Sequence, residues 1–296
     1  MEIMHCAGCG ITGGDDIKLR NCTACYLVRY CSVKCQKEHR PKHKKECKKR
    51  AAELRDEILF KQPECSYLGD CPICCLPLPI KDFSLYSCCC QRICHGCDWA
   101  NKTREFEGRQ REKCLFCRQP MPKSGEEAKI NYAKRAEAND PVALSALGGH
   151  YGNKGDDKKA CEYWTKAAEL GDINAHYNLS ISYRLGQGVE KNEEKGWHHL
   201  EKAAIGGHPI ARRNLGCKEG LDGREDRAIK HFIIAANMGD DDSLGKLKVM
   251  CRDGIASKED FASALRGYKA AVDATESPQR KAAEAAKQQG WQTFVC

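Results

Sequence analysis

Tyr163-Trp164-Thr165-Lys166-Ala167-Ala168-Glu169-Leu170-Gly171-Asp172, with Ala175-His176-Tyr177-Asn178-Leu179 just after it, sets the pattern of the C-terminal half. The pattern recurs at intervals of 32, 36 and 32 residues, through Leu147, Leu179, Leu215 and Leu247. Small residues recur in the same register at Ala143, Ala175, Ala211 and Ser243, and turn residues at Asn139, Gly171, Gly207 and Gly239. A period of this length indicates stacked structural repeats. Each unit predicts two short helices that cross at small residues and end at glycine or asparagine.

The quoted residues resemble the Sel-like subfamily of tetratricopeptide-type repeats, over residues 139 to about 240. Residues 241–280 keep the helical period and read as a terminal capping unit, and residues 281–296 are expected to be a fraying tail. The sequence therefore predicts an all-α solenoid over residues 139–280. The resemblance implies a concave face that holds extended peptides or partner helices, and no catalysis.

Two groups of side chains in the repeats raise alternative interpretations. Aromatic residues could contact a partner or fill the seam between helices, and we favour the seam for Tyr151, Tyr183, Trp164 and Trp197. Four histidines are dispersed among the repeats rather than spaced one helical turn apart, so we do not expect a metal site at His198, His199, His208 and His231.

The N-terminal part of the chain is dominated by cysteine. Of 22 cysteines in 296 residues, 18 fall within the first 117. The chain shows neither a basic and apolar leader nor an apolar run of about 18 residues, so we expect no secretory signal and no membrane span. We therefore expect an intracellular protein, in cytoplasm or nucleus, where paired cysteines bind metal instead of forming disulfides.

The first cysteine block supplies eight candidate ligands within 42 residues. Partners are separated by two residues, as in a tight knuckle, or by three, which places them one helical turn apart. Eight ligands suffice for two tetrahedral zinc ions, and a 50-residue segment with few large apolar residues needs such bonds to fold. The ligands are Cys6, Cys9, Cys22, Cys25, Cys31, Cys35, His43 and Cys47.

The runs Tyr30-Cys31-Ser32-x2-Cys35-Gln36 and Lys42-His43-Lys44-Lys45-Glu46-Cys47 resemble the MYND zinc finger. The resemblance implies an interleaved fold over residues 1–50, and the residue pattern after Arg50 predicts a helical linker at 51–69. One zinc would be held by Cys6, Cys9, Cys31 and Cys35, and the other by Cys22, Cys25, His43 and Cys47. Such fingers bind short proline-containing peptides, although the family's usual tryptophan is replaced here by Arg40. The lysine methyltransferases that carry this finger need a large catalytic domain for which this chain has no room.

The second cysteine block resembles a RING-type finger over residues 70–120, followed by a linker helix at 121–138. Outside a crowded triplet, its ligands are Cys71, Cys74, Cys94, Cys97, Cys114 and Cys117. The resemblance implies that, if this finger is an active ligase, Ile73 and Trp99 contact a ubiquitin-conjugating enzyme and Arg118 helps to lock the conjugate. His95, Cys65 and Cys75 are not needed as ligands.

The triplet Cys88-Cys89-Cys90 must supply both middle ligands of this finger, because Gln91 stands where a RING usually has histidine. Strand geometry would favour Cys88 with Cys90, which would face one way. Related stretches read Cys-Cys-Gly-Lys, which makes Cys90 the substitute for glycine and leaves Cys88 with Cys89. We favour the second pair, and expect about four zinc ions per chain.

Charge and motifs narrow the function. The formal charge of +8 falls to near +1 once zinc-bound thiolates are counted, so a nucleic-acid partner is disfavoured. The basic run from Arg40 to Arg50 continues into a helical pattern and is interpreted as a solvated helix face. No phosphate loop, nucleophile elbow or metalloprotease helix occurs. Two hypotheses remain, which are a zinc-stabilised protein-interaction adaptor and a RING-type ubiquitin-protein ligase that recruits substrate through the solenoid.

Overall fold

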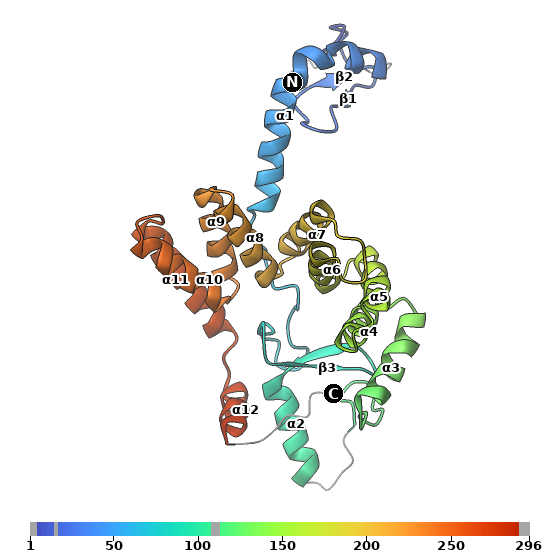
Figure 1. Ribbon diagram of the computed structural model, residues 1–296, viewed down its shortest axis with the longest axis vertical. Coiled ribbons are helices and arrows are strands. Elements are labelled where there is room, and N and C mark those ends of the chain that lie inside the picture. The colour runs from blue at the N-terminus through green and yellow to red at the C-terminus, as the bar shows by residue number, and fades with distance from the viewer. Residues whose placement is uncertain (1–4, 15–16, 108–112, 290–296) are drawn as a thin grey trace. The chain divides into compact units, whose positions relative to one another are not determined.

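The computed structural model describes residues 5–14, 17–107 and 113–289, and within them the chain forms two compact units (Figure 1). The first unit ends at Lys61 and the second begins at Gln62. Within these ranges, no helix combines the length and the apolar character needed to cross a bilayer.

The first unit is a small hairpin followed by one long helix. Strand β1 (Arg20–Asn21) pairs antiparallel with β2 (Arg29–Tyr30). Helix α1 (Val33–Leu59) begins after Ser32, whose hydroxyl accepts a hydrogen bond from the Cys35 amide as an N-cap. Of its 27 residues only His43 and Leu59 are buried, so the helix has almost no apolar face. This unit therefore depends on its cysteine and histidine side chains, not on an apolar core, for its fold.

Helix α1 spans the expected boundary at residue 50, in agreement with the helical pattern that continues past Arg50 in the sequence. It runs without a break from the first finger through most of the predicted linker and ends at Leu59. The segment 42–59 contains no glycine and no proline, so nothing in it interrupts helical hydrogen bonding.

The second unit begins with the second finger. Strands β3 (Phe83–Tyr86) and β4 (Gln91–Cys94) pair antiparallel and lead into α2 (His95–Glu107). The carboxylate of Asp98 is buried on α2 and accepts hydrogen bonds from the hydroxyls of Ser84 at 2.7 Å and Tyr86 at 2.8 Å. It also pairs with Lys102 at 3.0 Å. These bonds tie α2 to the hairpin and satisfy a charge that would be costly to bury alone.

The repeats form the rest of this unit, and Figure 1 shows them as a curved array from α3 to α11. Neighbouring helices pair along the chain, most extensively α4 with α5, α6 with α7 and α8 with α9. The helices are α3 (Gly125–Glu137), α4 (Pro141–Asn153), α5 (Asp157–Glu169), α6 (Ile173–Leu185), α7 (Glu193–Ile205), α8 (Pro209–Leu221), α9 (Glu225–Ala236), α10 (Asp241–Arg252), α11 (Lys258–Ala274) and α12 (Pro278–Gln288). The predicted solenoid is confirmed, and its fourth pair is α10 with α11.

The turn residues that mark the period adopt the conformation predicted for them. Asn139, Gly171, Gly207 and Gly239 all have positive φ, between 56° and 89°, which is the left-handed ending of a helix. The side chain of the next residue caps the following helix in each case, at Asp140, Asp172, His208 and Asp240. A stop signal and a start signal are therefore adjacent in every unit, which fixes the sharp reversal between helices.

Small residues also lie where the helices cross. A Cβ atom added to Gly148 would lie 2.3 Å from Nε1 of Trp164, and one added to Gly216 would lie 2.8 Å from the ring of Phe232. These pairs occupy equivalent positions in the period and place a large ring over a residue without a side chain. The close approach of the helices therefore depends on glycine at these points.

Candidate metal centres and their surroundings

The eight candidate ligands of the first unit meet in two groups of four. One group is Cys6, Cys9, Cys31 and Cys35, and the other is Cys22, Cys25, His43 and Cys47. The ligand atoms within each group all lie within 4.8 Å of one another. The sulfur atoms of Cys9 and Cys31 are 3.6 Å apart and those of Cys22 and Cys47 are 3.8 Å apart. A zinc ion with bonds of about 2.3 Å to sulfur places its ligands about 3.8 Å apart, so the donor sets fit zinc.

The second unit brings two further groups together. Cys71, Cys74, Cys94 and Cys97 form one group, and Cys88, Cys89, Cys114 and Cys117 form the other. The sulfur atoms of Cys74 and Cys94 are 3.8 Å apart and those of Cys89 and Cys114 are 3.5 Å apart. All four sulfurs of each group lie within 4.8 Å of one another, close to the separation of about 3.8 Å around a tetrahedral zinc. The residues of the second finger therefore also fit two ions.

Four of the five cysteine pairs separated by two residues share one backbone geometry, and the fifth, Cys94 with Cys97, lies at the start of α2. In these four knuckles the residue after the second cysteine has positive φ, and its amide donates a hydrogen bond of 2.8–3.0 Å to the carbonyl of the first cysteine. These residues are Gly10, Tyr26, Cys75 and Arg118. Three of them are not glycine, and each accepts a left-handed conformation that costs roughly 1–2 kcal/mol. Cys75 and Arg118 therefore have a structural role in shaping the knuckles.

The same geometry favours the ionised form of the first cysteine. Burial raises the pKa of Cys6, but amides of Cys9, Cys31 and Gly8 donate to its sulfur and lower the pKa to about 6. Burial is likewise outweighed by backbone amides at Cys22, whose pKa falls to about 6, and at Cys71, whose pKa falls to about 7. Since the thiolate is the form that binds metal, these sites are prepared to accept a cation.

The cysteine triplet is divided by a turn. Residues 87–90 connect β3 to β4 as a turn, so the alternation expected of a strand does not apply to them. The side chains of Cys88 and Cys89 join the metal-binding group, whereas Cys90 is buried among Ala128, Tyr132 and Leu147. Cys90 has a φ of +56°, the conformation that glycine would adopt without strain.

The three residues singled out for a conjugating enzyme lie in different surroundings. Ile73 is 45% exposed, Arg118 is exposed, and Trp99 is half-buried on α2. His95 lies outside the metal-binding groups, with its Nδ1 3.6 Å from a carboxylate oxygen of Asp82. The exposure of Cys65 and the position of Cys75 after a knuckle agree with their having no ligand role.

The second finger is fastened to the turns of the repeats. The ring of Tyr67 stacks on His208 at 4.7 Å, and His208 stacks on Tyr177 at 4.4 Å. The amide group of Asn237 donates a hydrogen bond of 3.2 Å to Gln62. Burial raises the pKa of Tyr67 to about 12 and lowers that of His208 to about 4, so both rings are neutral near pH 7. The segment before the second finger is therefore held against the repeats by contacts within the same chain.

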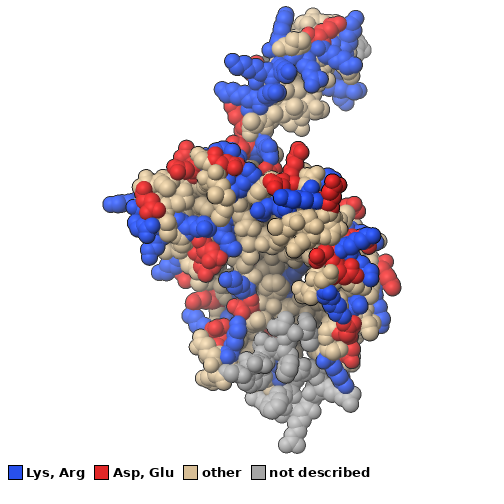
Figure 2. Space-filling model, viewed as in Figure 1, with Lys and Arg blue, Asp and Glu red and all other residues tan. Residues whose placement is uncertain are grey.

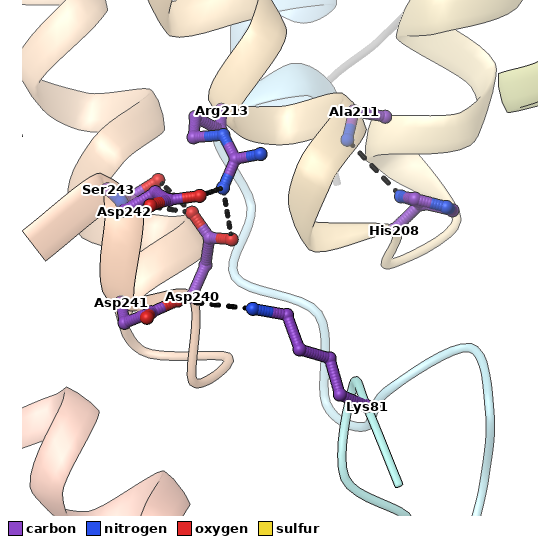
Figure 3. A network of polar contacts seen from close by, with 8 residues as sticks. All are labelled: Lys81, His208, Ala211, Arg213, Asp240, Asp241, Asp242 and Ser243. Atoms are coloured by element: carbon purple, nitrogen blue, oxygen red, sulfur yellow. Dashed lines mark hydrogen bonds and ion pairs between the residues drawn. The ribbon is translucent and has the colours of Figure 1, made fainter. Parts of the chain in front are cut away.

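An acidic cluster at the start of α10 also lies where the second finger meets the repeats (Figure 3). Asp240, Asp241 and Asp242 lie close together, but Arg213 pairs with Asp240 at 2.7 Å and with Asp242 at 2.6 Å. Lys81 of the second finger lies 3.9 Å from Asp241. Because these two cations offset part of the charge of the three carboxylates, and Asp240 caps α10, the cluster is a structural junction.

The aromatic residues of the repeats lie in the seams between helices, as favoured from the sequence. The indole of Trp164 donates a hydrogen bond of 3.2 Å to the carbonyl of Ser145. Tyr151 stacks on Tyr163 at 5.4 Å, and the equivalent pair one repeat later, Tyr183 with His199, stacks at 5.6 Å. Trp197 lies beneath Arg184, whose guanidinium carbon is 4.1 Å from the ring centre.

Basic side chains gather on the first unit, as Figure 2 shows. They follow the exposed surface of α1, where Lys42, Lys44, Lys45, Lys48 and Lys49 are all exposed. The zinc-ligand side chains of His43 and Cys47 point to the opposite, inner side of the unit, because they join the metal-binding group. This arrangement agrees with the interpretation of the basic run as a solvated helix face.

Comparison with protein families finds matches in two parts of the chain. Residues 6–47 match the MYND finger, and residues 141–172, 173–208 and 209–240 each match the Sel1 repeat. A search of the curated proteins found no match.

Solved structures similar to this chain include other repeat proteins. A Sel1 repeat protein from Oxalobacter formigenes has 26% identity and a TM-score of 0.46 over 58% of this chain and 51% of its own. A protective antigen of uropathogenic Escherichia coli has 24% identity and a TM-score of 0.41 over 60% and 38%. An immunity protein from Pseudomonas aeruginosa has 18% identity and a TM-score of 0.30 over 62% and 84%. The match thus spans about half or less of the first two structures.

These findings establish the general character of the protein. It carries a MYND finger followed by Sel1 repeats, and its four cysteine-rich groups are suited to zinc. The family matches therefore support a zinc-binding protein that interacts with other proteins.

Proposed function

We propose that this protein is an adaptor whose two units each hold a different protein partner, with the MYND finger binding a short proline-containing segment. The division of the chain into two compact units is the observation that carries the proposal, because each unit has its own recognition element. The thiolate ligands require a reducing environment, so the proposal places the protein in cytoplasm or nucleus.

Exposed apolar side chains support a peptide site on the first unit. Tyr26 is 63% exposed, Leu27 is 52% exposed and Val33 is 62% exposed, all within the hairpin and the first turn of α1. Apolar side chains of this size on a unit with so small a core are available for contact with a partner. A proline-containing peptide presents rigid apolar rings to such a surface and loses little conformational entropy on binding.

A titration of the full chain with a panel of fluorescent proline-containing peptides tests this site. We expect saturable binding that weakens at least tenfold in Leu27→Ala and in Tyr26→Gly. Glycine is chosen at position 26 because it adopts the left-handed backbone of this knuckle without strain. Ile58→Ala is the matched control, because Ile58 is also exposed, at 58%, but lies near the other end of α1. Equal binding by all the variants, or no binding by the wild type, would contradict the proposal for this finger.

A second candidate function is ubiquitin transfer by the RING-like finger. The exposure of Ile73 and Arg118 favours it, because these are the positions at which the resemblance predicts contact with a charged conjugating enzyme. A RING ligase forms no covalent intermediate and acts by holding the conjugate in a reactive geometry.

Discharge of ubiquitin from a panel of charged conjugating enzymes by the full chain distinguishes the two functions. A ligase would accelerate discharge, and Ile73→Ala and Arg118→Ala would each abolish the effect. Arg118→Gly controls for backbone strain, because it removes the side chain while glycine adopts the left-handed conformation of this knuckle without strain. No discharge with any conjugating enzyme, at full zinc content, would leave the finger as a structural part of the adaptor.

A further inference from the structure

The last described helix, α12, packs against the second finger although about 200 residues separate them in sequence (Figure 1). Its main contact is with α2, which begins among the zinc-ligand cysteines. The backbones approach closely at Gly96, where an added Cβ would lie 2.8 Å from the amide nitrogen of Arg280. At the other end of α12, Lys287 pairs with Asp82 at 2.9 Å. Part of the segment expected to be a fraying tail is thus an ordered helix that covers the finger.

Arg280 connects this helix to the first knuckle of the finger. Its guanidinium donates hydrogen bonds to the carbonyls of Pro77 at 2.8 Å and Leu76 at 3.3 Å, and to the sulfur of Cys74 at 3.4 Å. A further bond of 2.7 Å to the carbonyl of Thr275 fixes the guanidinium at the start of its own helix. Four donors are therefore used in one planar fork, a geometry that lysine cannot reproduce.

The chemistry of the knuckle explains why a cation is placed there. Cys74 belongs to a group of four cysteines, and four thiolates around one Zn²⁺ leave a net charge of −2. A guanidinium that donates to one of these sulfurs offsets part of this charge and fixes the direction of the ligand. Partners of this kind, which bond to a ligand and not to the metal, typically change metal affinity 10- to 100-fold.

We propose that α12 is an intramolecular clamp on the Cys71, Cys74, Cys94 and Cys97 site and that Arg280 is its positioning residue, which slows the loss of zinc. The inference rests on zinc binding by the second finger, which the zinc content of the wild type tests separately. The clamp holds the finger from the C-terminal side of the array, while Cys90 packs among α3 and α4 at the other side.

Zinc release from the full chain to a chromogenic chelator tests the clamp, with zinc content per chain measured beforehand by elemental analysis. We expect Arg280→Ala to accelerate one release phase by 10- to 100-fold, and Arg280→Lys to do so by a smaller factor. Cys71→Ser identifies the phase, because it removes that site. Lys281→Ala is the matched control, since Lys281 neighbours Arg280 but its ion pair is with the exposed Glu276. We expect release from this variant at the wild-type rate.

Gly96→Ala provides an independent test that leaves Arg280 in place. The added methyl group would displace the backbone of α12, so the same phase should accelerate as in Arg280→Ala. Wild-type release rates in both Arg280→Ala and Gly96→Ala would overturn the clamp. Equal acceleration in Lys281→Ala would also overturn it, because the effect would then not be specific to Arg280. A wild-type chain that holds only the two zinc ions of the first finger would remove the premise and the inference together.

Discussion

Replacing each cysteine of the triplet by alanine in turn should separate the two ligands from the third member. Cys88→Ala and Cys89→Ala each remove one sulfur from a group of four, so we expect three zinc ions per chain instead of four. Cys90→Ala should retain all four, because the side chain of Cys90 is packed against the first helices of the array. The three variants make the same chemical change at neighbouring positions and therefore control for one another.

The stability effect at Cys90 can be estimated from its surroundings. The residue is 8% exposed, so removing its sulfur should cost about 1 kcal/mol of burial free energy. Its φ of +56° imposes a backbone cost of roughly 1–2 kcal/mol that glycine would not bear. We therefore expect Cys90→Ala to lower the free energy of unfolding by about 1 kcal/mol, whereas Cys90→Gly should stay near the wild type because the two effects offset each other.

Elemental analysis of the purified variants gives the zinc count, and urea denaturation gives the free energy of unfolding of the second unit. Three zinc ions in Cys90→Ala together with four in Cys88→Ala would refute the assignment of ligands. A Cys90→Gly variant less stable than Cys90→Ala would refute the role given to backbone conformation, even if the zinc counts agree.

Three further outcomes are expected. Gly148→Ala should destabilise the array by about 1–3 kcal/mol in urea denaturation, because the methyl group meets the Trp164 ring. Gly149→Ala places its methyl group in open space and should raise the free energy of unfolding by about 0.5–1 kcal/mol. Equal urea midpoints for the two variants would contradict the packing argument. Burial lowers the pKa of His208 to about 4, below the value of about 6.5 in an unfolded chain, so the unfolded state gains a proton first and stability falls as pH drops from 6.5 towards 4. His208→Asn, which keeps a capping acceptor, should lose about 2 kcal/mol less than the wild type between pH 7 and pH 5, and an unchanged pH dependence would count against this account. Chelation of zinc should leave the repeats helical by circular dichroism, since the cluster around Leu144 and Leu179 contains no metal ligand, and loss of most of the helical signal would be inconsistent with this.

The repeats were predictable because their signals are local. A left-handed turn residue is followed directly by an N-cap in each repeat, so the sequence around Gly171 and Asp172 is enough to end one helix and begin the next. The spacing of the cysteines within each knuckle is equally local, and the resemblance to the MYND finger supplied the pairing of distant knuckles. The structure groups these first-finger ligands in the same way.

The contacts that the sequence did not reveal are those without a local signal. Whether residues 87–90 form a strand or a turn decides which cysteines face the metal, and four consecutive residues of this kind fit either structure. Helix α12 has only Ala283 buried, and the apolar side of the helix consists of alanines, so the small area it can bury gave little indication that it docks. Arg280 is one of many basic residues in the sequence, and only the fold places it beside Cys74.

The contacts of the second finger limit how the repeats can be used by a partner. The turns at Gly207 and His208 already hold Pro63, Cys65 and Tyr67 of the same chain, so a partner that approached this edge would have to displace Tyr67 from its stack. Displacement would expose an aromatic ring and break its stacking with a neutral histidine, at a cost of about 0.5–1.5 kcal/mol beyond the burial of the ring. A partner of the array that leaves Tyr67 in its stack is therefore expected to bind away from the turn at Gly207 and His208, on repeat surface that the same chain does not already cover.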